Sequence, residues 1–142
     1  MDVEEKIGSF KECACKLCDD SRDFKDYNAA ANRYYYYIFR KINFYCKVIK
    51  NADPEYDPVT ANVVGSHNKT IALISEFAKD KLDEIQGTDN IKELYLSQLV
   101  GSVLMLKDRR RKADYGDEGI TVKQIKEIER GVNKIEMALS YL

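Results

Sequence analysis

The segment from Phe24 to Lys50 contains neither proline nor glycine. Its apolar residues recur at helical spacing, and no strand-like alternation interrupts them. At a rise of 1.5 Å per residue, the segment would form one helix about 40 Å long. The second half of this helix is apolar nearly all round, which is typical of a helix at the centre of a bundle or at a dimer face. A helix of this length predicts helical neighbours packed along it.

The remainder of the chain repeats the helical pattern in four shorter segments. The first segment covers residues 3 to 18, and the second begins at a predicted N-cap, Ser66, and continues to Ile85. The third begins at a predicted N-cap, Asp89, and leads into an arginine run. The last begins with a capping box at Thr121. Short loops between long helices place neighbours antiparallel. We therefore expect an all-α fold, an antiparallel up-and-down bundle of about five helices, in a single domain that covers residues 1–142.

The charges nearly balance, with 23 Lys and Arg against 24 Asp and Glu and a formal net charge of −1. No overall field draws such a chain to nucleic acid, so any nucleic-acid binding must come from a local patch. No apolar run reaches the length of a membrane span, and the first residues are too acidic and polar for a signal peptide. We expect a cytoplasmic protein that does not associate with membranes.

The four cysteines predict reduced thiols rather than a metal centre. Cys13, Cys15 and Cys18 form a C-x-C-x-x-C cluster, a spacing that occurs among zinc and iron–sulfur ligands. The cluster lies inside a helical pattern, however, and one face of a helix cannot present all three residues to one metal. Cys46 lies in another helix, and no second ligand pair accompanies it. We therefore expect no metal and no cofactor.

The run Arg109-Arg110-Arg111-Lys112, followed at once by Ala113-Asp114-Tyr115, is the strongest functional signal in the sequence. Four consecutive cations in a near-neutral chain indicate a site for an anion such as RNA, a nucleotide or an acidic partner. The alternative is a helix C-terminus that collects cations because its carbonyl end is negative.

Three segments together resemble the HEPN superfamily (higher eukaryotes and prokaryotes nucleotide-binding domain). Residues 26–39 read DYNAAANRYYYYIF and resemble the AxNRxYYAxF helix of that family. Gly65-Ser66-His67 resembles a turn that precedes the third HEPN helix, and residues 106–121 resemble the LxxxRxxADYG…IT segment. In order and spacing, the three segments cover nearly the whole chain, as in a small stand-alone bacterial, archaeal or phage member.

The resemblance implies a helical bundle that dimerises and, in many members, acts as a metal-independent RNase in toxin or immune systems. The family motif is an arginine followed four to six residues later by a histidine, and two copies meet across the dimer. Arginine stabilises phosphate charge, and histidine transfers protons near neutral pH. We accordingly expect an RNA- or nucleotide-interacting protein of a defence, toxin–antitoxin or stress system.

This chain departs from the family motif because no histidine follows the arginine run. If the chain cleaves RNA, Arg109 or Arg111 would hold the scissile phosphate, and Asp114, Tyr115 or His67 would supply proton transfer. The predicted nucleic-acid-binding residues are Arg33, Arg109, Arg110, Arg111 and Lys112. Whether the chain is an enzyme stays open at this point.

Each predicted site residue also has a structural interpretation. Arg33 lies among apolar residues and needs a partner such as Asp114, in a pair that would lock two helices together. Asp114 could instead cap a turn, and Tyr115 could pack its ring. Tyr34 to Tyr37 could stack bases, although core and dimer contacts are favoured. A non-catalytic module that binds a partner, such as a nucleotidyltransferase or another defence-system protein, through this tyrosine-rich helix is the alternative function, and a plain helical adaptor is a third.

Overall fold

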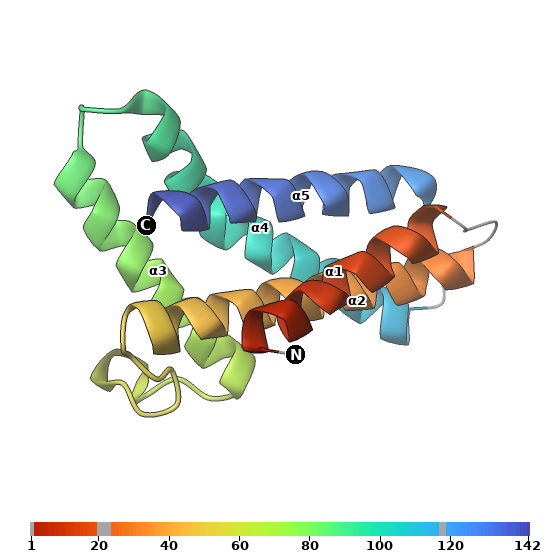
Figure 1. Ribbon diagram of the computed structural model, residues 1–142, viewed down its shortest axis with the longest axis horizontal. Helices are drawn as coiled ribbons and strands as arrows, with labels where there is room; N and C mark the ends of the chain where they lie inside the picture. Colours follow the sequence, from red (N-terminus) through yellow and green to blue (C-terminus); the bar gives the residue numbers. More distant parts are fainter. Residues whose placement is uncertain (1, 20–23, 117–118) are drawn as a thin grey trace. The chain divides into compact units, whose positions relative to one another are not determined.

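The computed structural model describes residues 2–19, 24–116 and 119–142. Within these ranges the chain forms five α-helices and no strand (Figure 1). The helices are α1 (Val3–Asp19), α2 (Phe24–Phe44), α3 (Ser66–Ile85), α4 (Asn90–Tyr115) and α5 (Val122–Tyr141). The prediction of an all-α fold with about five helices is confirmed. None of the helices in the described ranges is long and apolar enough to cross a membrane.

The end of the long second helix differs from the prediction. The α-helical part of α2 ends at Phe44, and a π-helical turn, η1 (Tyr45–Ile49), continues it almost to the expected end. The Lys50 N–H donates to the Tyr45 carbonyl oxygen over 3.1 Å, which is the i to i+5 bond of a π-turn. The spacing of apolar residues therefore located the helix, but it could not reveal the change in winding.

Two of the three predicted helix caps are present. The Asp89 carboxylate accepts the N–H groups of Ile91 and Lys92 at 3.1 Å each. Thr121 and Gln124 form the predicted reciprocal capping box, with distances of 3.0 and 3.1 Å. These bonds satisfy amide groups that a helix N-terminus leaves without partners.

The prediction that Ser66 caps α3 is wrong. The cap is Gly65, which adopts φ 93°, and Ser66 is the first residue of the helix. Glycine adopts this positive φ without the steric strain of a side chain. Gly116, just after α4, is needed for a different reason, because a Cβ there would lie only 2.5 Å from the Lys112 carbonyl oxygen.

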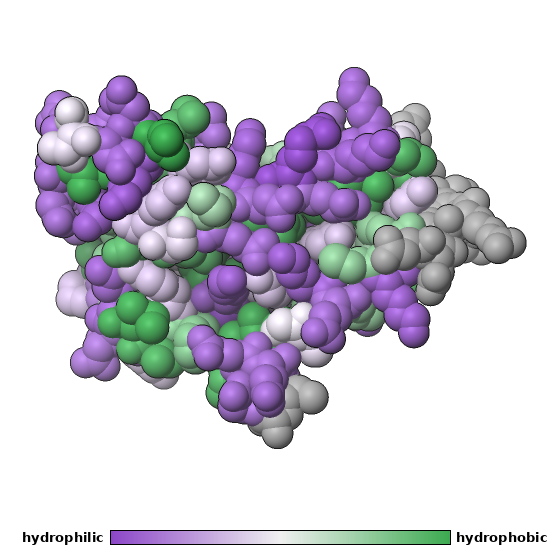
Figure 2. Space-filling view, turned by 45° about the horizontal axis from the view of Figure 1, so that its top comes forward, coloured by the Kyte–Doolittle hydropathy of each residue, from purple (hydrophilic) through white to green (hydrophobic). Residues whose placement is uncertain are grey.

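The chain groups into two compact units, to both of which α2, α4 and α5 contribute. Unit 1 comprises Met1–Ile38 and Val103–Asn133, and unit 2 comprises Phe39–Ser102 and Lys134–Leu142. The buried apolar residues of unit 1 include Ala30, Ala31, Tyr34, Tyr35, Tyr37, Ile38, Val103, Leu106, Ile125, Ile128 and Val132. Those of unit 2 include Ile42, Cys46, Leu73, Ile74, Ala78, Leu96, Leu99, Ile135 and Ala138. On the face that Figure 2 displays, polar side chains are interspersed with small apolar areas.

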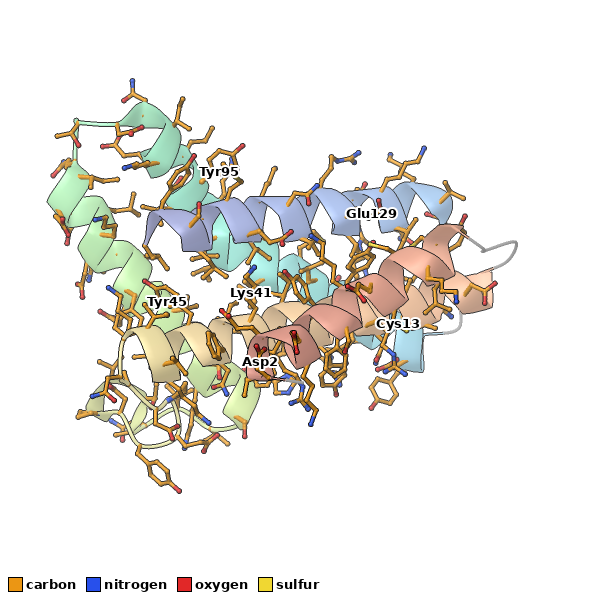
Figure 3. The ribbon with its side chains drawn as sticks, viewed as in Figure 1. Asp2, Cys13, Lys41, Tyr45, Tyr95 and Glu129 are labelled. Carbon is orange, nitrogen blue, oxygen red and sulfur yellow. The ribbon has the colours of Figure 1, made fainter. Side chains whose placement is uncertain are left out.

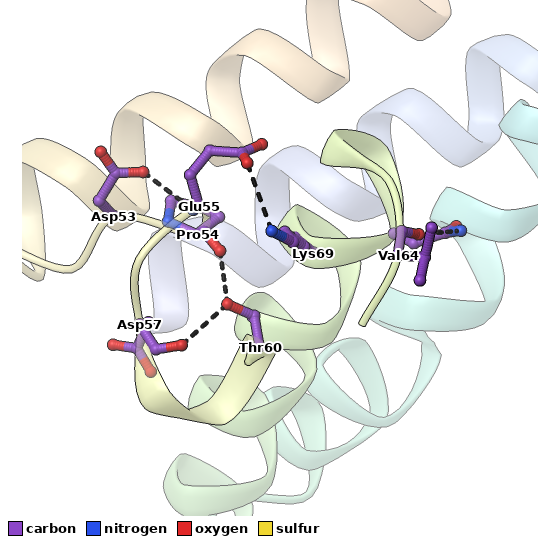
Figure 4. A network of polar contacts seen from close by, with 8 residues as sticks. Asp53, Pro54, Glu55, Asp57, Thr60, Val64 and Lys69 are labelled. Carbon is purple, nitrogen blue, oxygen red and sulfur yellow. Dashed lines mark hydrogen bonds and ion pairs between the residues drawn. The ribbon is translucent and has the colours of Figure 1, made fainter. Parts of the chain in front are cut away.

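In unit 2 a compact polar network organises the loop between η1 and α3 (Figure 4). The Thr60 hydroxyl, fully buried in the short helix η2 (Pro58–Thr60), lies within hydrogen-bond distance of the Pro54 and Asp57 carbonyl oxygens. Lys69 on α3 pairs with Glu55 at 3.5 Å. A buried hydroxyl with acceptors in reach avoids the penalty of an unsatisfied polar group. The Thr60 hydroxyl therefore helps to hold this loop in its conformation within unit 2.

Alkaline conditions should destabilise the fold through Cys46, which is fully buried in unit 2. Burial, reinforced by Asp57, raises the pKa of this thiol from 9.0 to about 12. The folded chain keeps the thiol protonated where the unfolded chain ionises it, so the stability contribution is complete below about pH 9 and is lost as pH rises towards 12. In that window the free energy of unfolding should fall by up to about 1.4 kcal/mol per pH unit.

Urea unfolding at about pH 8 and about pH 11 would measure this loss. A Cys46→Ala variant should be less stable at pH 8 but should lose less stability between the two pH values than the wild-type chain. Cys13→Ala, which changes an exposed thiol, is the matched control and should follow the wild type. Equal losses in the wild type and Cys46→Ala would contradict the prediction.

Candidate functional site

The predicted arginine run forms the last turns of α4 in unit 1, and its three guanidinium groups have different environments. Arg110 is the most enclosed. Its guanidinium carbon lies 5.3 and 5.4 Å from the ring centroids of Tyr35 and Tyr36 on α2. Its Nη2 donates to the Tyr36 hydroxyl over 3.2 Å. With its side chain only 17% exposed, Arg110 is a packing residue, held by cation–π contacts.

Asp114 completes the surroundings of Arg110. One carboxylate oxygen lies 3.3 Å from the Arg110 Nε, one helical turn away on α4. This ion pair lacks hydrogen-bond geometry, because within the described residues Arg110 Nε makes no hydrogen bond. The Asn32 side-chain amide on α2 lies 3.3 and 3.5 Å from the two oxygens of Asp114. Asp114 is therefore already engaged by a cation and by an amide donor.

The expected partnership between Arg33 and Asp114 is wrong. Arg33 is exposed, and its Nη1 donates to the Asn32 side-chain oxygen over 3.4 Å. Asn32, its neighbour in sequence, contacts Asp114 instead. Arg33 follows Asn32 by one residue and therefore points to a different side of α2, roughly 100° around the helix. Arg33 thus avoids the penalty of a buried charge by facing solvent.

Arg109 joins α4 to α5. Its Nη2 lies 3.0 Å from a carboxylate oxygen of Glu127, and its side chain is 21% exposed. Its Nε is buried and makes no hydrogen bond to any described residue. The predicted phosphate ligand Arg109 is thus committed to an ion pair within unit 1.

The remaining predicted site residues at the end of α4 face solvent. Arg111 and Lys112 are exposed, and Lys112 pairs with Asp108 over 3.3 Å. Tyr115 is 80% exposed, so its ring does not pack as the structural alternative predicted. The accessible members of the predicted site are therefore Arg33, Arg111, Lys112 and Tyr115.

His67 does not belong to the same unit as the arginine run. It is the second residue of α3 in unit 2, and its ring stacks on Phe39 with centroids 4.0 Å apart and planes inclined by 23°. All the other predicted site residues belong to unit 1, and the role of His67 in proton transfer stays a prediction.

Two asparagines were missed as site residues. Asn28 and Asn32 are four residues apart, so they share one face of α2. The Asn28 side-chain oxygen accepts the Ile120 N–H over 2.8 Å, and Asn32 contacts Asp114. Asn32 thus contacts the end of α4, and Asn28 contacts the chain just before α5. Their i, i+4 spacing on a helix with a buried opposite face was the available sequence signal.

A thiol and hydroxyl cluster lies elsewhere in unit 1. The Cys15 sulfur is 3.4 Å from the buried Tyr34 hydroxyl. Burial, followed by the nearby carboxylate of Glu129, raises the pKa of Cys18 to about 12. Figure 3 labels Glu129 on α5 and the exposed Cys13 on α1. In the described part of the chain, no group of three or more His, Cys, Asp or Glu side chains is placed to hold a metal ion.

Comparisons with protein-family models, with curated proteins and with solved structures find no match for this chain. The resemblance to the HEPN superfamily therefore depends on the three sequence segments alone.

Replacing Arg110 should destabilise unit 1 far more than replacing its neighbour. Arg110→Ala would remove two ring contacts and a hydrogen bond, and would leave Asp114 without its ion pair. We expect a loss of about 2 kcal/mol in the free energy of unfolding. Arg111→Ala, at an exposed position, should stay within about 0.5 kcal/mol of the wild type. Urea unfolding of both variants checks this difference, and equal losses would show that Arg110 does not have this role.

Proposed function

We propose that this chain is a HEPN-like RNA- or nucleotide-interacting protein of a cytoplasmic defence, toxin–antitoxin or stress system. The observation that carries the proposal is the contact between Asn32 and Asp114. It holds α2 against the end of α4, and Arg33, Arg111 and Tyr115 are exposed residues of these two helix segments. We call these three exposed residues the α2–α4 patch.

The contacts support the proximity of the patch residues. Arg33 touches Asn32, Asn32 touches Asp114, and Arg111 precedes Asp114 by three residues on the same helix. Residues three apart on a helix have Cβ atoms about 5–6 Å apart. Two guanidinium groups at such a surface suit phosphate oxygens, which arginine binds in a fork geometry. An exposed tyrosine beside them offers a ring on which a base can stack.

The same contacts favour binding over cleavage. Arg109 is paired with Glu127, and both oxygens of Asp114 are engaged. Tyr115 is exposed, and its hydroxyl makes no hydrogen bond to another described residue. We therefore propose that a single copy of the chain binds RNA or a nucleotide and that cleavage is not its main activity.

The alternative function, a partner-binding module that uses the tyrosine-rich helix, loses its predicted surface. Tyr34, Tyr35 and Tyr37 are buried, and Tyr36 is engaged by Arg110. A nucleotidyltransferase or another defence-system protein would therefore have to bind a different face of the chain.

Binding of a fluorescently labelled single-stranded RNA, followed by anisotropy at several salt concentrations, tests the proposal. An Arg33→Ala/Arg111→Ala double variant should bind roughly tenfold more weakly or worse at low salt, because two phosphate contacts are lost. The slope of log affinity against log salt concentration should fall by about two.

Lys126→Ala/Arg130→Ala is a matched control, since it removes two exposed cations from α5 in the same unit. It should retain wild-type affinity. Parallel gels with and without a chelator would reveal cleavage and its dependence on metal. Failure of the wild-type chain to bind RNA or nucleotides, or equal affinities for both double variants, would refute the α2–α4 patch.

A further inference from the structure

A groove lies where α3 ends and α4 begins, wholly within unit 2 (Figure 1). Its volume is about 530 Å³, which is in the range of small-molecule sites in proteins. Along α4 the lining extends from Asn90 to Ser97, a distance of about 10 Å at the helical rise of 1.5 Å per residue. The groove is therefore long enough for a chain of several methylene groups.

The charged side chains of this groove are all anionic. Asp83 on α3 and Glu93 on α4 place one carboxylate on each wall, and within the described chain no lysine or arginine lines the groove. The cations nearest in sequence have other partners: Lys81 pairs with a carboxylate of its own helix over 3.3 Å, and Lys92 lies over a tyrosine ring of α5. The carbonyl end of α3 and the amide end of α4 meet here, so their dipoles oppose. The two carboxylates therefore set the sign of the local potential.

The polar groups of the groove can accept hydrogen bonds from a ligand. The Gly87 N–H donates to one carboxylate oxygen of Glu93, which holds this side chain at the turn and leaves its second oxygen accessible. The side chains of Asp83, Gln86 and Asn90 make no hydrogen bond or ion pair with other residues that the structure describes. A carboxylate is an acceptor only, and each amide side chain carries an acceptor oxygen. The groove thus offers four acceptor groups to a ligand rich in N–H donors.

Two leucines give the groove an apolar component. Leu82 lies on the α3 wall and Leu94 on the α4 wall, and Leu94 is 54% exposed. The methylene groups of a lysine side chain lie along apolar surface in this way, while its ammonium group stays in polar surroundings. The lining is therefore complementary to an aliphatic chain that carries ammonium groups.

We propose that this groove binds a linear aliphatic polyamine, in which short methylene chains join two or more ammonium groups. Asp83 and Glu93 each accept an ammonium group, the two amide side chains accept further N–H donors, and the methylene groups lie along the two leucines. A ligand with several ammonium groups is favoured over a single ammonium because each wall carries its own carboxylate. The site is distinct from the α2–α4 patch and does not require that the chain binds RNA.

Isothermal titration of the full chain with spermidine at low ionic strength tests the proposal, because salt screens exposed charges. The wild type should bind one spermidine per chain. Asp83→Asn and Glu93→Gln should each weaken binding about threefold to fivefold, as expected for the loss of one exposed ion pair. Both changes keep the shape of the side chain, and glutamine can still accept the Gly87 N–H. Asp80→Asn removes an exposed carboxylate of α3 outside the groove and should retain wild-type affinity.

Three further measurements locate the ligand and define its chemistry. In ¹⁵N–¹H spectra of the wild type, spermidine should shift the amide of Gly87 but not that of Gly65, at the opposite end of α3. Mg²⁺, a cation without a methylene chain, should not displace spermidine at equal concentration. Nα-acetyl-lysine methylamide represents a lysine side chain of a partner protein, and with one ammonium group it should bind more weakly than spermidine.

Four outcomes would overturn the proposal. The first is a wild-type chain that does not bind spermidine saturably, and the second is an equal loss of affinity in Asp80→Asn and Asp83→Asn. The third is displacement of spermidine by equimolar Mg²⁺, which would show a response to charge alone. The fourth is a lysine derivative that binds as tightly as spermidine, which would identify a partner's side chain as the occupant. The shift of the Gly87 amide requires no variant and so decides the location even if a variant fails to fold.

Discussion

The enclosure of the Arg110 guanidinium between Tyr35 and Tyr36 is the interaction on which the geometry of the candidate site depends. A cation that is largely removed from water is tolerated only when other groups compensate for the lost hydration. Here two ring faces, a phenolic oxygen and the Asp114 carboxylate provide that compensation. Because the rings belong to α2 and the cation to α4, the same contacts fix the end of α4 against α2. The exposed residues of the α2–α4 patch depend on that placement.

The arginine run shows how strongly local environment separates neighbouring residues of one type. Arg109 faces Glu127 on α5, Arg110 faces the tyrosines of α2, and Arg111 faces solvent. Successive residues on a helix point about 100° apart, so three consecutive arginines cannot form one continuous binding surface. Two of them make contacts within unit 1, and the third faces solvent. A charge count alone would have assigned all three to the same function.

The elements of the fold were predictable because they follow from periodicity and capping. The five helices, the Asp89 cap and the Thr121 capping box follow from local patterns that can be identified in the sequence. The π-turn and the glycine cap at Gly65 were not predictable, because they depend on backbone dihedral angles and hydrogen bonds that the spacing of apolar residues does not determine. At the site, the position of the arginine run at a helix end was predictable, but the choice of Asn32 rather than Arg33 as the partner of Asp114 was not. Asn32 and Arg33 point about 100° apart around α2. Which of the two faces Asp114 depends on how α2 and α4 pack together.

The π-turn at the end of α2 has a consequence for how this chain tolerates insertions and deletions. A π-turn holds one residue more than the corresponding α-helical hydrogen-bonded turn, and it therefore confines a one-residue insertion to a single turn. Upstream, the buried face that includes Ile38 and Ile42 keeps its phase, while Cys46 in the wide turn still points inward and Lys47 to Ile49 point outward. Removing one residue here would restore α-helical winding and leave the chain that follows nearly in phase. The loop that carries Thr60 and leads to α3 should therefore tolerate the gain or loss of one residue at this turn, because its own contacts hold it in place.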